Sequence, residues 1–365
     1  MILYRYFAKK FLASFGATLA IILMFLMLID LVEHYRKFDG FDVQFVQLIQ
    51  LVLLNAPAQV NVILPLIMII STIALFVTLA RTSELIVTRA AGRSGLRALL
   101  APLVIAAFIG LIAITTLNPI ASITTVHMER LTELYKTGEF STLSISDEGV
   151  WLRQGSTGGQ TVIHAERYRE KTKTYFDVTF IEYERDSGPV RRIFADTAML
   201  VEGGWFLKNV KQWNLRIGSN PEDTALENQT LRFASTLTQD YIRETLGNPR
   251  GISIWDLPRT IQKLSQAGFS TRAYETWFQS ELSRPLFLVA MVLIASAFTM
   301  RHSRLGGTGT VVLISLILGF GLYFIRNFAL VLGESGQLPI LIAAWAPAIA
   351  SVLLAYGLLL HTEDG

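Results

Sequence analysis

The residues with the greatest potential for chemistry lie in one short stretch, ARTSELIVTRAAGRSG, at residues 80–95. This stretch is polar and basic, and it separates two long apolar runs. Thr82 or Ser83 can cap a helix, Gly92 can end it, and the residues between them repeat at helical spacing. The pattern predicts a short amphipathic helix at about residues 81–92, too polar to span a membrane. Two roles fit it: an interfacial connector whose arginines meet lipid phosphates, or a coupling helix that docks on a cytoplasmic ATPase.

No constellation typical of an enzyme accompanies this stretch. The five histidines, at positions 34, 127, 164, 302 and 361, lack the spacing of metal ligands. There is no G-x-S-x-G motif, and the glycine-rich pieces GRSGLR and GGTGTV lack the lysine of a phosphate-binding loop. The chain has no cysteine, which excludes disulfides and thiolate chemistry. We therefore expect no enzyme activity, metal or cofactor, and we expect ATP hydrolysis in a separate partner.

One charge lies within an apolar run. Arg326 falls about two turns from the external end of the fifth apolar segment. It is suited either to extend to the outer lipid head groups or to face a cavity and bind an anionic head group. Asp30 lies at the end of a segment, and we expect no acid in the middle of any segment. This argues against a proton- or ion-coupled carrier, which normally has buried carboxylates near the bilayer centre.

Composition indicates that membrane-spanning helices must position these residues. Hydrophobic residues make up 52% of the chain and charged residues 17%, whereas a soluble protein has about 25% charged residues. The apolar residues form blocks near both ends, with a polar block of about 150 residues between them. The net charge of +3 is too small to suggest binding to nucleic acid, and basic residues beside membrane spans explain it.

Six apolar segments are long enough to cross the hydrocarbon core, for which a helix needs about 20 residues. Arg284 and Pro285 interrupt the fourth segment, which can span if it begins near Trp277 and bends at Pro285. The segments are roughly residues 11–31, 51–79, 98–117, 286–300, 311–332 and 338–360.

Basic residues orient these spans, because cytoplasmic loops are enriched in lysine and arginine. Such residues gather at positions 5–10, 81–97 and 301–304. The sequence thus predicts a multi-pass membrane protein with cytoplasmic N- and C-termini and an external polar block, which in a bacterium would lie in the periplasm. The first apolar run is too long for a signal peptide, and we interpret it as an uncleaved anchor.

The polar block has a period of two. In FDVTFIEYE, at residues 176–184, Phe176, Val178 and Phe180 alternate with other side chains, and turn signals such as ERDSGP and VEGGW separate the strands. The pattern predicts an all-β sandwich or jelly roll. We interpret its aromatic residues mainly as core, with an apolar slot for an acyl chain as the alternative; they are Trp151, Trp205, Phe206, Trp213 and Phe233.

The expected fold is a polytopic α-helical membrane protein, with three spans on each side of an inserted all-β, jelly-roll-like periplasmic domain. Residues 1–119 hold spans one to three and the amphipathic helix, residues 120–276 form the periplasmic domain, and residues 277–365 hold spans four to six. Near the end of the middle domain, Asp256 is suited to cap a helix over LPRTIQKLSQAG.

Several motifs resemble the lipopolysaccharide-export permease family, which comprises LptF and LptG subunits. The opening stretch closely resembles the family's R-S-E-L-x-x-x-[RQ]-A-[SCA]-G signature between spans two and three, and YRYFAKKF before the first span also matches. STLSISDEGVWLRQG and GESGQLPILIAAWAPAIA look more like the G subunit. The resemblance covers essentially the whole chain.

The resemblance implies a mechanism. Family members pair as an F–G heterodimer over a homodimer of a cytoplasmic, LptB-like ATPase. Lipopolysaccharide enters their cavity from the outer leaflet of the inner membrane, and ATP-driven collapse moves it to the β domains and a periplasmic, LptC- and LptA-like bridge. The coupling residues on this interpretation are Arg81, Ser83, Glu84, Leu85 and Arg89.

The family's basic lipid contacts at the external end of the first span fall on Arg36 and Lys37, within EHYRKF. There they would meet the phosphates of lipid A, and Arg326 is a third candidate. Asp30 occupies a position where some G subunits have a basic residue, and Arg326 occupies a position where an acid can be found in the family. We interpret these departures as charge that has moved between spans.

Two other functions stay open on the sequence alone. An ABC-type mechanotransmission protein also has an external domain and a coupling helix, but it moves no lipid and typically has fewer spans. A membrane assembly scaffold would use the charged loop only as an interfacial anchor. Six spans divided three and three favour the permease.

Overall fold

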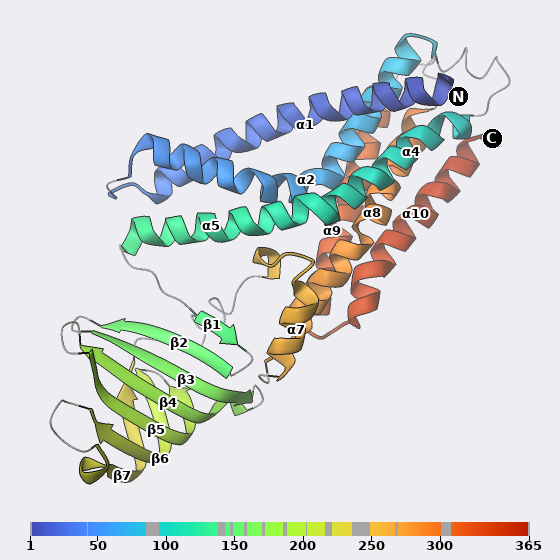
Figure 1. Ribbon diagram of the computed structural model, residues 1–365. Helices are drawn as coiled ribbons and strands as arrows, with labels where there is room; N and C mark the ends of the chain where they lie inside the picture. The colour runs from blue at the N-terminus through green and yellow to red at the C-terminus, as the bar shows by residue number, and fades with distance from the viewer. Residues whose placement is uncertain are drawn as a thin grey trace. The chain divides into compact units, whose positions relative to one another are not determined.

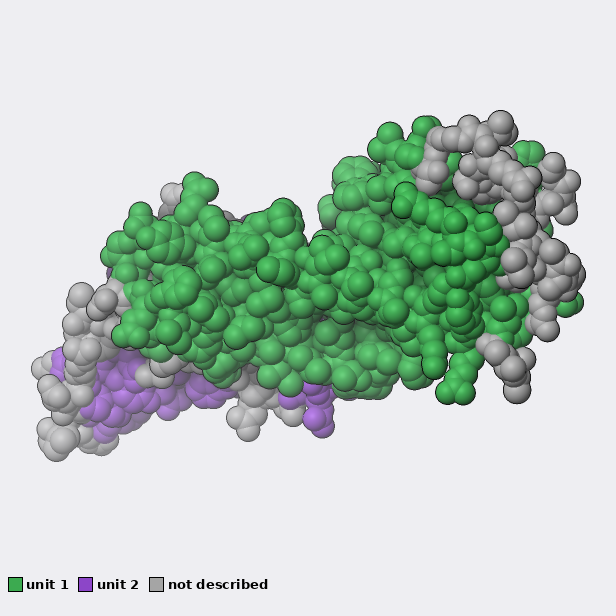
Figure 2. Space-filling model, turned by 90° about the horizontal axis from the view of Figure 1, so that it is seen from above, with its two compact units in different colours: residues 1–136, 250–255, 272–365 green, residues 137–249, 256–271 purple. Residues whose placement is uncertain are grey.

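A computed structural model of the chain describes two compact units, shown in green and purple in Figure 2. The first comprises Met1–Lys136, Arg250–Trp255 and Arg272–Gly365, and the second comprises Thr137–Pro249 and Asp256–Thr271. The residues that the structure describes are 2–41, 43–84, 95–137, 143–146, 149–156, 159–169, 172–184, 188–201, 203–215, 221–235, 249–266, 269–300 and 308–363.

Long helices make up the first unit, and both its first and its last helix reach the same end of the unit (Figure 1). Among the described residues, six segments are long and apolar enough to cross a membrane, which confirms the predicted spans. The third span combines three consecutive elements. The elements are α1 (Ile2–Lys37), α2 (Phe45–Arg81), α4 (Gly95–Ile112), η1 (Ala113–Leu117), α5 (Asn118–Thr137), α8 (Arg272–Thr299), α9 (Thr308–Glu334) and α10 (Ile340–Glu363).

The third span continues past its predicted end. The π-helical turn η1 joins α4 to α5, and the helix runs on to Thr137 through polar sequence that hydropathy does not detect. Pro119 offers no N–H to the carbonyl of Thr115, four residues before it. Trp255 Nε1 donates to that oxygen over 3.4 Å, so a side chain from outside the helix meets the acceptor.

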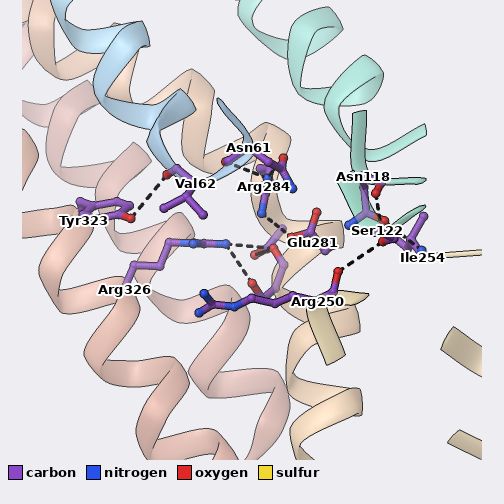
Figure 3. Close-up of polar contacts among 12 residues, drawn as sticks. Asn61, Val62, Asn118, Ser122, Arg250, Ile254, Glu281, Arg284, Tyr323 and Arg326 are labelled. Carbon is purple, nitrogen blue, oxygen red and sulfur yellow. Dashed lines mark hydrogen bonds and ion pairs between the residues drawn. The ribbon is translucent and has the colours of Figure 1, made fainter. Parts of the chain in front are cut away.

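The segment Arg250–Trp255 is bound to α5 by two further hydrogen bonds (Figure 3). Asn118 Oδ1 accepts from the backbone N–H of Ile254 over 2.9 Å, and Ser122 Oγ donates to the carbonyl of Arg250 over 3.3 Å. These bonds satisfy polar groups that would be costly to leave unpaired when buried. They also explain why this segment belongs to the helical unit although it lies between two parts of the second unit in the sequence.

The central helix of the first unit is α8, which contacts α2, α4, α9 and α10. Its side chains Phe287, Met291 and Ile294 are fully buried. Close approach of α4 depends on Gly110, because a Cβ atom there would lie 2.6 Å from Cα of Pro285. Small residues at helix crossings permit such contacts, which contribute packing energy between membrane helices.

In the second unit, the described strands form one antiparallel sheet in which each strand pairs with its neighbours in sequence. The all-β prediction is confirmed, but this order is a meander, whereas a sandwich or jelly roll divides its strands between two sheets. A sequence period of two predicts that strands form but does not predict their order in the sheet. The order depends on the segments that connect the strands. The strands are β1 (Leu143–Ser146), β2 (Gly149–Ser156), β3 (Gly159–Arg169), β4 (Thr174–Glu184), β5 (Gly188–Val201), β6 (Gly204–Asn214) and β7 (Leu226–Ala234).

One face of this sheet carries the core of the second unit, centred on Trp205. The Trp205 ring meets the Tyr175 ring edge to face at 5.1 Å, a preferred geometry for aromatic pairs. Trp205 and Phe233 are buried, which confirms their predicted place in the core. Trp151 and Trp213 lie on the opposite face of the sheet, because side chains alternate between the two faces along a strand. The residue that follows Trp151, and the residue that follows the strand partner of Trp213, are both core residues.

The helix predicted after Asp256 is present as α7 (Leu257–Gln266). The backbone N–H of Thr260 donates to the carbonyl of Asp256 over 3.0 Å, which begins the helical hydrogen-bond ladder. Leu257 and Leu264 are buried, so the apolar face of α7 is covered.

Candidate functional site

The chain turns sharply at the end of α2. The helix ends at Arg81, and the N–H of Thr82 donates to the carbonyl of Thr78 over 3.0 Å. Ser83 then has a φ of 57°, in the left-handed region that most residues avoid. Of the residues predicted to couple to an ATPase, Arg81 thus belongs to the last turn of α2 and Ser83 to the turn that precedes Glu84.

Three side chains of the described part of the chain meet the carboxylate of Glu84. Lys10 Nζ lies 2.6 Å from Oε1, the Tyr6 hydroxyl donates to Oε2 over 2.7 Å, and Thr82 Oγ1 donates to Oε1 over 3.0 Å. The Lys10 ammonium also lies 4.8 Å from the centre of the Tyr6 ring, a cation–π contact. Glu84 therefore connects the beginning of α1 to the end of α2.

The charge of Glu84 follows from these contacts. Burial raises the pKa of its carboxyl, but the hydrogen bonds from Lys10, Tyr6 and Thr82 lower it more, so the pKa lies below its ordinary value. The carboxylate is therefore ionised at neutral pH. The Lys10 and Glu84 side chains are 30% and 29% exposed, so water and salt compete for this ion pair.

Sequence reasoning identified Glu84 and missed its partners. Tyr6 and Lys10 lie in YRYFAKKF, a segment used only for orientation and resemblance. The sequence did contain a signal for this pairing. Glu84 is a single acid within a basic loop, and the basic N-terminus was predicted to lie on the same side of the membrane. Leu85 and Arg89, the other two predicted coupling residues, lie outside the residues that the structure describes, and their role stays a prediction.

Arg36 and Lys37 lie at the other end of α1, in its last turn, and both side chains are exposed. Cations are favourable there because the helix C-terminus carries partial negative charge. At a rise of about 1.5 Å per residue, they lie roughly 40 Å along the helix from Lys10. One continuous helix thus carries the Lys10 contact with Glu84 at one end and, at the other, the predicted lipid-binding residues Arg36 and Lys37, called the basic rim below.

Asp30 does not belong to that rim, because its side chain is buried between α1 and α2. Asn55 Nδ2 donates to both carboxylate oxygens, over 3.0 and 3.1 Å. His34 Nδ1 lies 2.9 Å from the Asp30 carbonyl, which can only accept, so Nδ1 carries the proton. The acid at the end of the first span therefore joins two helices.

Arg326 is buried within the helical unit and points to α8 (Figure 3). Its Nη2 donates to the carbonyl and the hydroxyl of Ser280 over 3.1 and 3.0 Å, and its guanidinium lies 5.1 Å from the centre of the Phe287 ring. Only 6% of the residue is exposed, so it does not extend to the head groups as one interpretation expected. Its role in binding lipid stays a prediction.

The expectation was that no acid lies in the middle of a span, yet one span contains a buried acid in its first half. Glu281 lies in the span formed by α8, is fully buried and forms an ion pair with Arg284, itself 5% exposed. Sequence reasoning treated Arg284 as an interruption of the span and did not consider Glu281. The signal was present, since residues three apart on a helix lie on the same face and can pair.

The contacts of Glu84, Asp30, Arg284 and Arg326 each join two helices of the first unit. Within the described ranges, no group of three or more His, Cys, Asp or Glu side chains could hold a metal ion. The chain matches the model of the lipopolysaccharide export system permease LptF/LptG over residues 5–361.

The chain belongs to the LptF/LptG family. The lipopolysaccharide export system permease protein LptG of Haemophilus influenzae is 22% identical over an alignment of 326 residues that covers 85% of each chain. The match extends through both units, so the permease family accounts for the helices and the sheet together.

The second unit of this permease has a hollow on the sheet face opposite the core. Its volume is about 330 Å³, at the lower end of the range for pockets that bind small molecules. Apolar side chains make up half of its lining, and Arg192 contributes a cation. The residues that line it are Trp151, Val162, His164, Thr179, Ile181 and Arg192.

Proposed function

We propose that this chain is the G-type permease subunit of an ATP-driven exporter in a bacterial inner membrane. In this role it extracts lipopolysaccharide from the outer leaflet and passes it to a periplasmic bridge of the LptC and LptA type. It works beside an LptF-like permease subunit and over a dimer of a cytoplasmic LptB-like ATPase. Its termini lie in the cytoplasm, and the β unit lies in the periplasm.

The observation that supports this proposal most strongly is the set of contacts around Glu84, next to the family's signature loop. Through Lys10 and Tyr6, the residue joins two membrane-spanning helices at the point where a cytoplasmic partner would press on the loop. The family match over residues 5–361 supports a transport subunit without a catalytic site of its own. A push on the loop would therefore reach α1 and α2 directly.

Arg36 and Lys37 supply the lipid side of the proposal. Lipid A carries phosphates, and exposed basic side chains at the external end of a span can bind them at the head-group level. Extraction removes many methylene groups from the bilayer at roughly 0.8 kcal/mol each, so it needs an external energy source. The roughly 40 Å of α1 between Lys10 and these residues joins the driven end to the lipid end.

Arg326 enters the proposal through charge balance. Two guanidinium groups, those of Arg284 and Arg326, lie near the single carboxylate of Glu281, and Arg326 Nε has no hydrogen-bond partner among the described residues. A surplus buried cation is costly, and an anionic group of the lipid would stabilise it. Access to Arg326 requires α9 to move away from α8 during transport.

The experiment is an export assay with the reconstituted complex of both permease subunits and the ATPase. Glu84→Ala removes the acceptor for Lys10 and Tyr6, and we expect lipopolysaccharide release to fall by at least about tenfold, a coupling loss of about 1.4 kcal/mol. The ATPase should still hydrolyse ATP. Release to a purified periplasmic acceptor and phosphate production are measured in the same vesicles.

The matched control is Glu182→Ala in the β unit, which removes a similar ion pair with Arg191 over 2.7 Å. This variant should retain release. Unchanged export in Glu84→Ala would contradict the coupling role and favour an interfacial anchor in a scaffold protein. Normal ATPase assembly without any lipopolysaccharide release from the unmodified complex would favour a mechanotransmission protein.

A further inference from the structure

The middle of α2 contains a carbonyl group that its own helix cannot satisfy. Pro65 lies inside α2 and has no N–H, so the carbonyl of Asn61, four residues earlier, loses its helical donor. Water cannot supply a donor within the hydrocarbon core, and neighbouring side chains must do so. Arg284 Nη1 donates to the Asn61 carbonyl over 3.0 Å and also to the Asn61 side-chain oxygen.

Glu281 holds Arg284 in this position. The two residues are three apart on α8, their side chains form an ion pair, and Glu281 is fully buried. Arg284 thus contacts its own helix through a charge and α2 through two hydrogen bonds, all within the unit's interior (Figure 3). Such a pair is costly to desolvate, and removing either ion leaves the other buried without its partner.

A third helix meets the same level of α2. The Tyr323 hydroxyl donates to the carbonyl of Val62 over 3.4 Å, and Arg326 Nη2 donates to the carbonyl of Ser280 on α8 (Figure 3). The polar contacts of α2, α8 and α9 therefore cluster within about one turn of Pro65. The four residues Asn61, Glu281, Arg284 and Arg326 are called the Pro65 cluster below.

The position of the Pro65 cluster matters because a helix bends most easily at proline. The α2 helix runs from Phe45 to Arg81, and the contacts of Glu84 follow its last turn. A displacement of the Arg81 end would be absorbed by bending at Pro65 unless another helix fixes that point. The only helix joined to the orphan carbonyl by described side-chain hydrogen bonds is α8, which also contacts α4, α9 and α10.

We propose that Arg284, held by Glu281, is a positioning residue that fixes α2 to α8 at the carbonyl left open by Pro65. Movement of the Arg81 end of α2 is thereby passed to the central helix of the unit. This inference rests on the proposed coupling role of Glu84. The part that concerns the helices can be tested without any ATPase.

The test compares three variants in the full-length chain, which has no cysteine of its own. The first variant combines Glu281→Leu with Arg284→Met. It removes both members of the ion pair, so that neither is left as an unpaired charge. The second adds Pro65→Ala, which restores the N–H donor to the Asn61 carbonyl. The third adds Pro57→Ala instead, as a matched proline of the same helix.

The first readout is the distance between spin labels on cysteines introduced at Ile70 and Leu282, two exposed positions on α2 and α8. We expect a single narrow distribution in the unmodified chain and a broader one when the ion pair is removed. Pro65→Ala should narrow it again, and Pro57→Ala should not. An unchanged distribution after removal of the pair would overturn the inference.

The second readout is lipopolysaccharide released per ATP hydrolysed in the assembled exporter. It should fall at least about fivefold without the pair and recover to at least half with Pro65→Ala. Recovery by both proline substitutions would point to general stabilisation and overturn the specific role of Pro65. If the unmodified complex releases no lipopolysaccharide, the proposed function fails, while the distance measurement still decides the helix contact.

Discussion

Two carboxylate–cation pairs meet α2, one just after its end and one near its middle, and they differ in exposure. At its end, Glu84 pairs with Lys10, and both side chains are about one third exposed. Near its middle, Arg284 from α8 pairs with Glu281 and donates to Asn61, and this group is almost entirely buried. The chemistry of the two pairs is similar, and the surroundings are opposite.

This difference assigns different tasks to the two places. An exposed pair contributes about 0–1 kcal/mol and can exchange its partner for water or for another protein. A buried pair is costly to break, because the remaining ion has no water to solvate it. The end of α2 is thus suited to rearrange when a partner binds, and its middle is suited to stay fixed to α8.

The largest expected effect comes from breaking the buried pair on one side. Glu281→Leu leaves Arg284 and Arg326 together without a carboxylate, and we expect a loss of about 3–5 kcal/mol in the free energy of unfolding. Adding Arg284→Met should restore most of the lost free energy of unfolding, because replacing a buried ion pair by an apolar pair of similar volume often leaves stability unchanged. SDS-induced unfolding of the two variants measures both values, and equal losses would contradict the pairing.

A second effect tests how rigidly α8 is packed. Gly110→Ala places a methyl group against the backbone of Pro285, and we expect a loss of about 1–3 kcal/mol. Apart from the adjoining backbone of its own helix, a Cβ atom at Gly321, on α9, would meet no described atom within 4 Å, and there Gly→Ala should be neutral or stabilising by up to about 1 kcal/mol. Thermal unfolding in one detergent compares the two, and similar losses would argue against a tight α4–α8 crossing.

The exposed pair should give a small change in stability. Glu84→Gln keeps the shape and removes the charge, and we expect a loss below about 1 kcal/mol that shrinks further in high salt. Export should nevertheless fall, since the link between α1 and α2 is weakened. A large, salt-independent loss of stability would show that this end of α2 is as fixed as its middle.

The smallest effect is the pH dependence of the same pair. The pKa of Glu84 is lower in the folded chain than its unfolded value of about 4.3. Its stabilising contribution is therefore present above about pH 4.3 and is lost as the pH falls through the folded pKa. The difference in unfolding temperature between the unmodified chain and Glu84→Gln should thus disappear at lower pH; a constant difference would contradict the assignment.

The six spans and the all-β insertion could be predicted because length, hydropathy and a period of two are local properties. The order of the strands could not, since each strand has the same alternation whichever neighbour it pairs with. The polar continuation of the third span was missed because hydropathy ends before the helix does. Its support comes from Trp255 and the Arg250–Trp255 segment, more than 130 residues away in the chain.

The candidate site was predicted in part. Glu84 was identified by its motif, and its partner Lys10 was not, because 74 residues separate them in the sequence. Arg326 was identified as a charge in an apolar run, but its burial against Ser280 depends on how α8 and α9 pack. Glu281 was missed because an acid near a predicted span boundary was counted outside the span.

The most direct test of the account is photo-crosslinking of lipopolysaccharide from position 36, in place of Arg36, within the assembled exporter. We predict that the adduct forms without ATP. In the otherwise unmodified complex it should disappear when ATP is added. When Glu84→Ala is also present, the adduct should persist after ATP is added. This outcome would show that lipid contact at position 36 of α1 depends on Glu84, at the end of α2. Absence of the adduct in a folded complex, or its clearance in both complexes, would contradict the account.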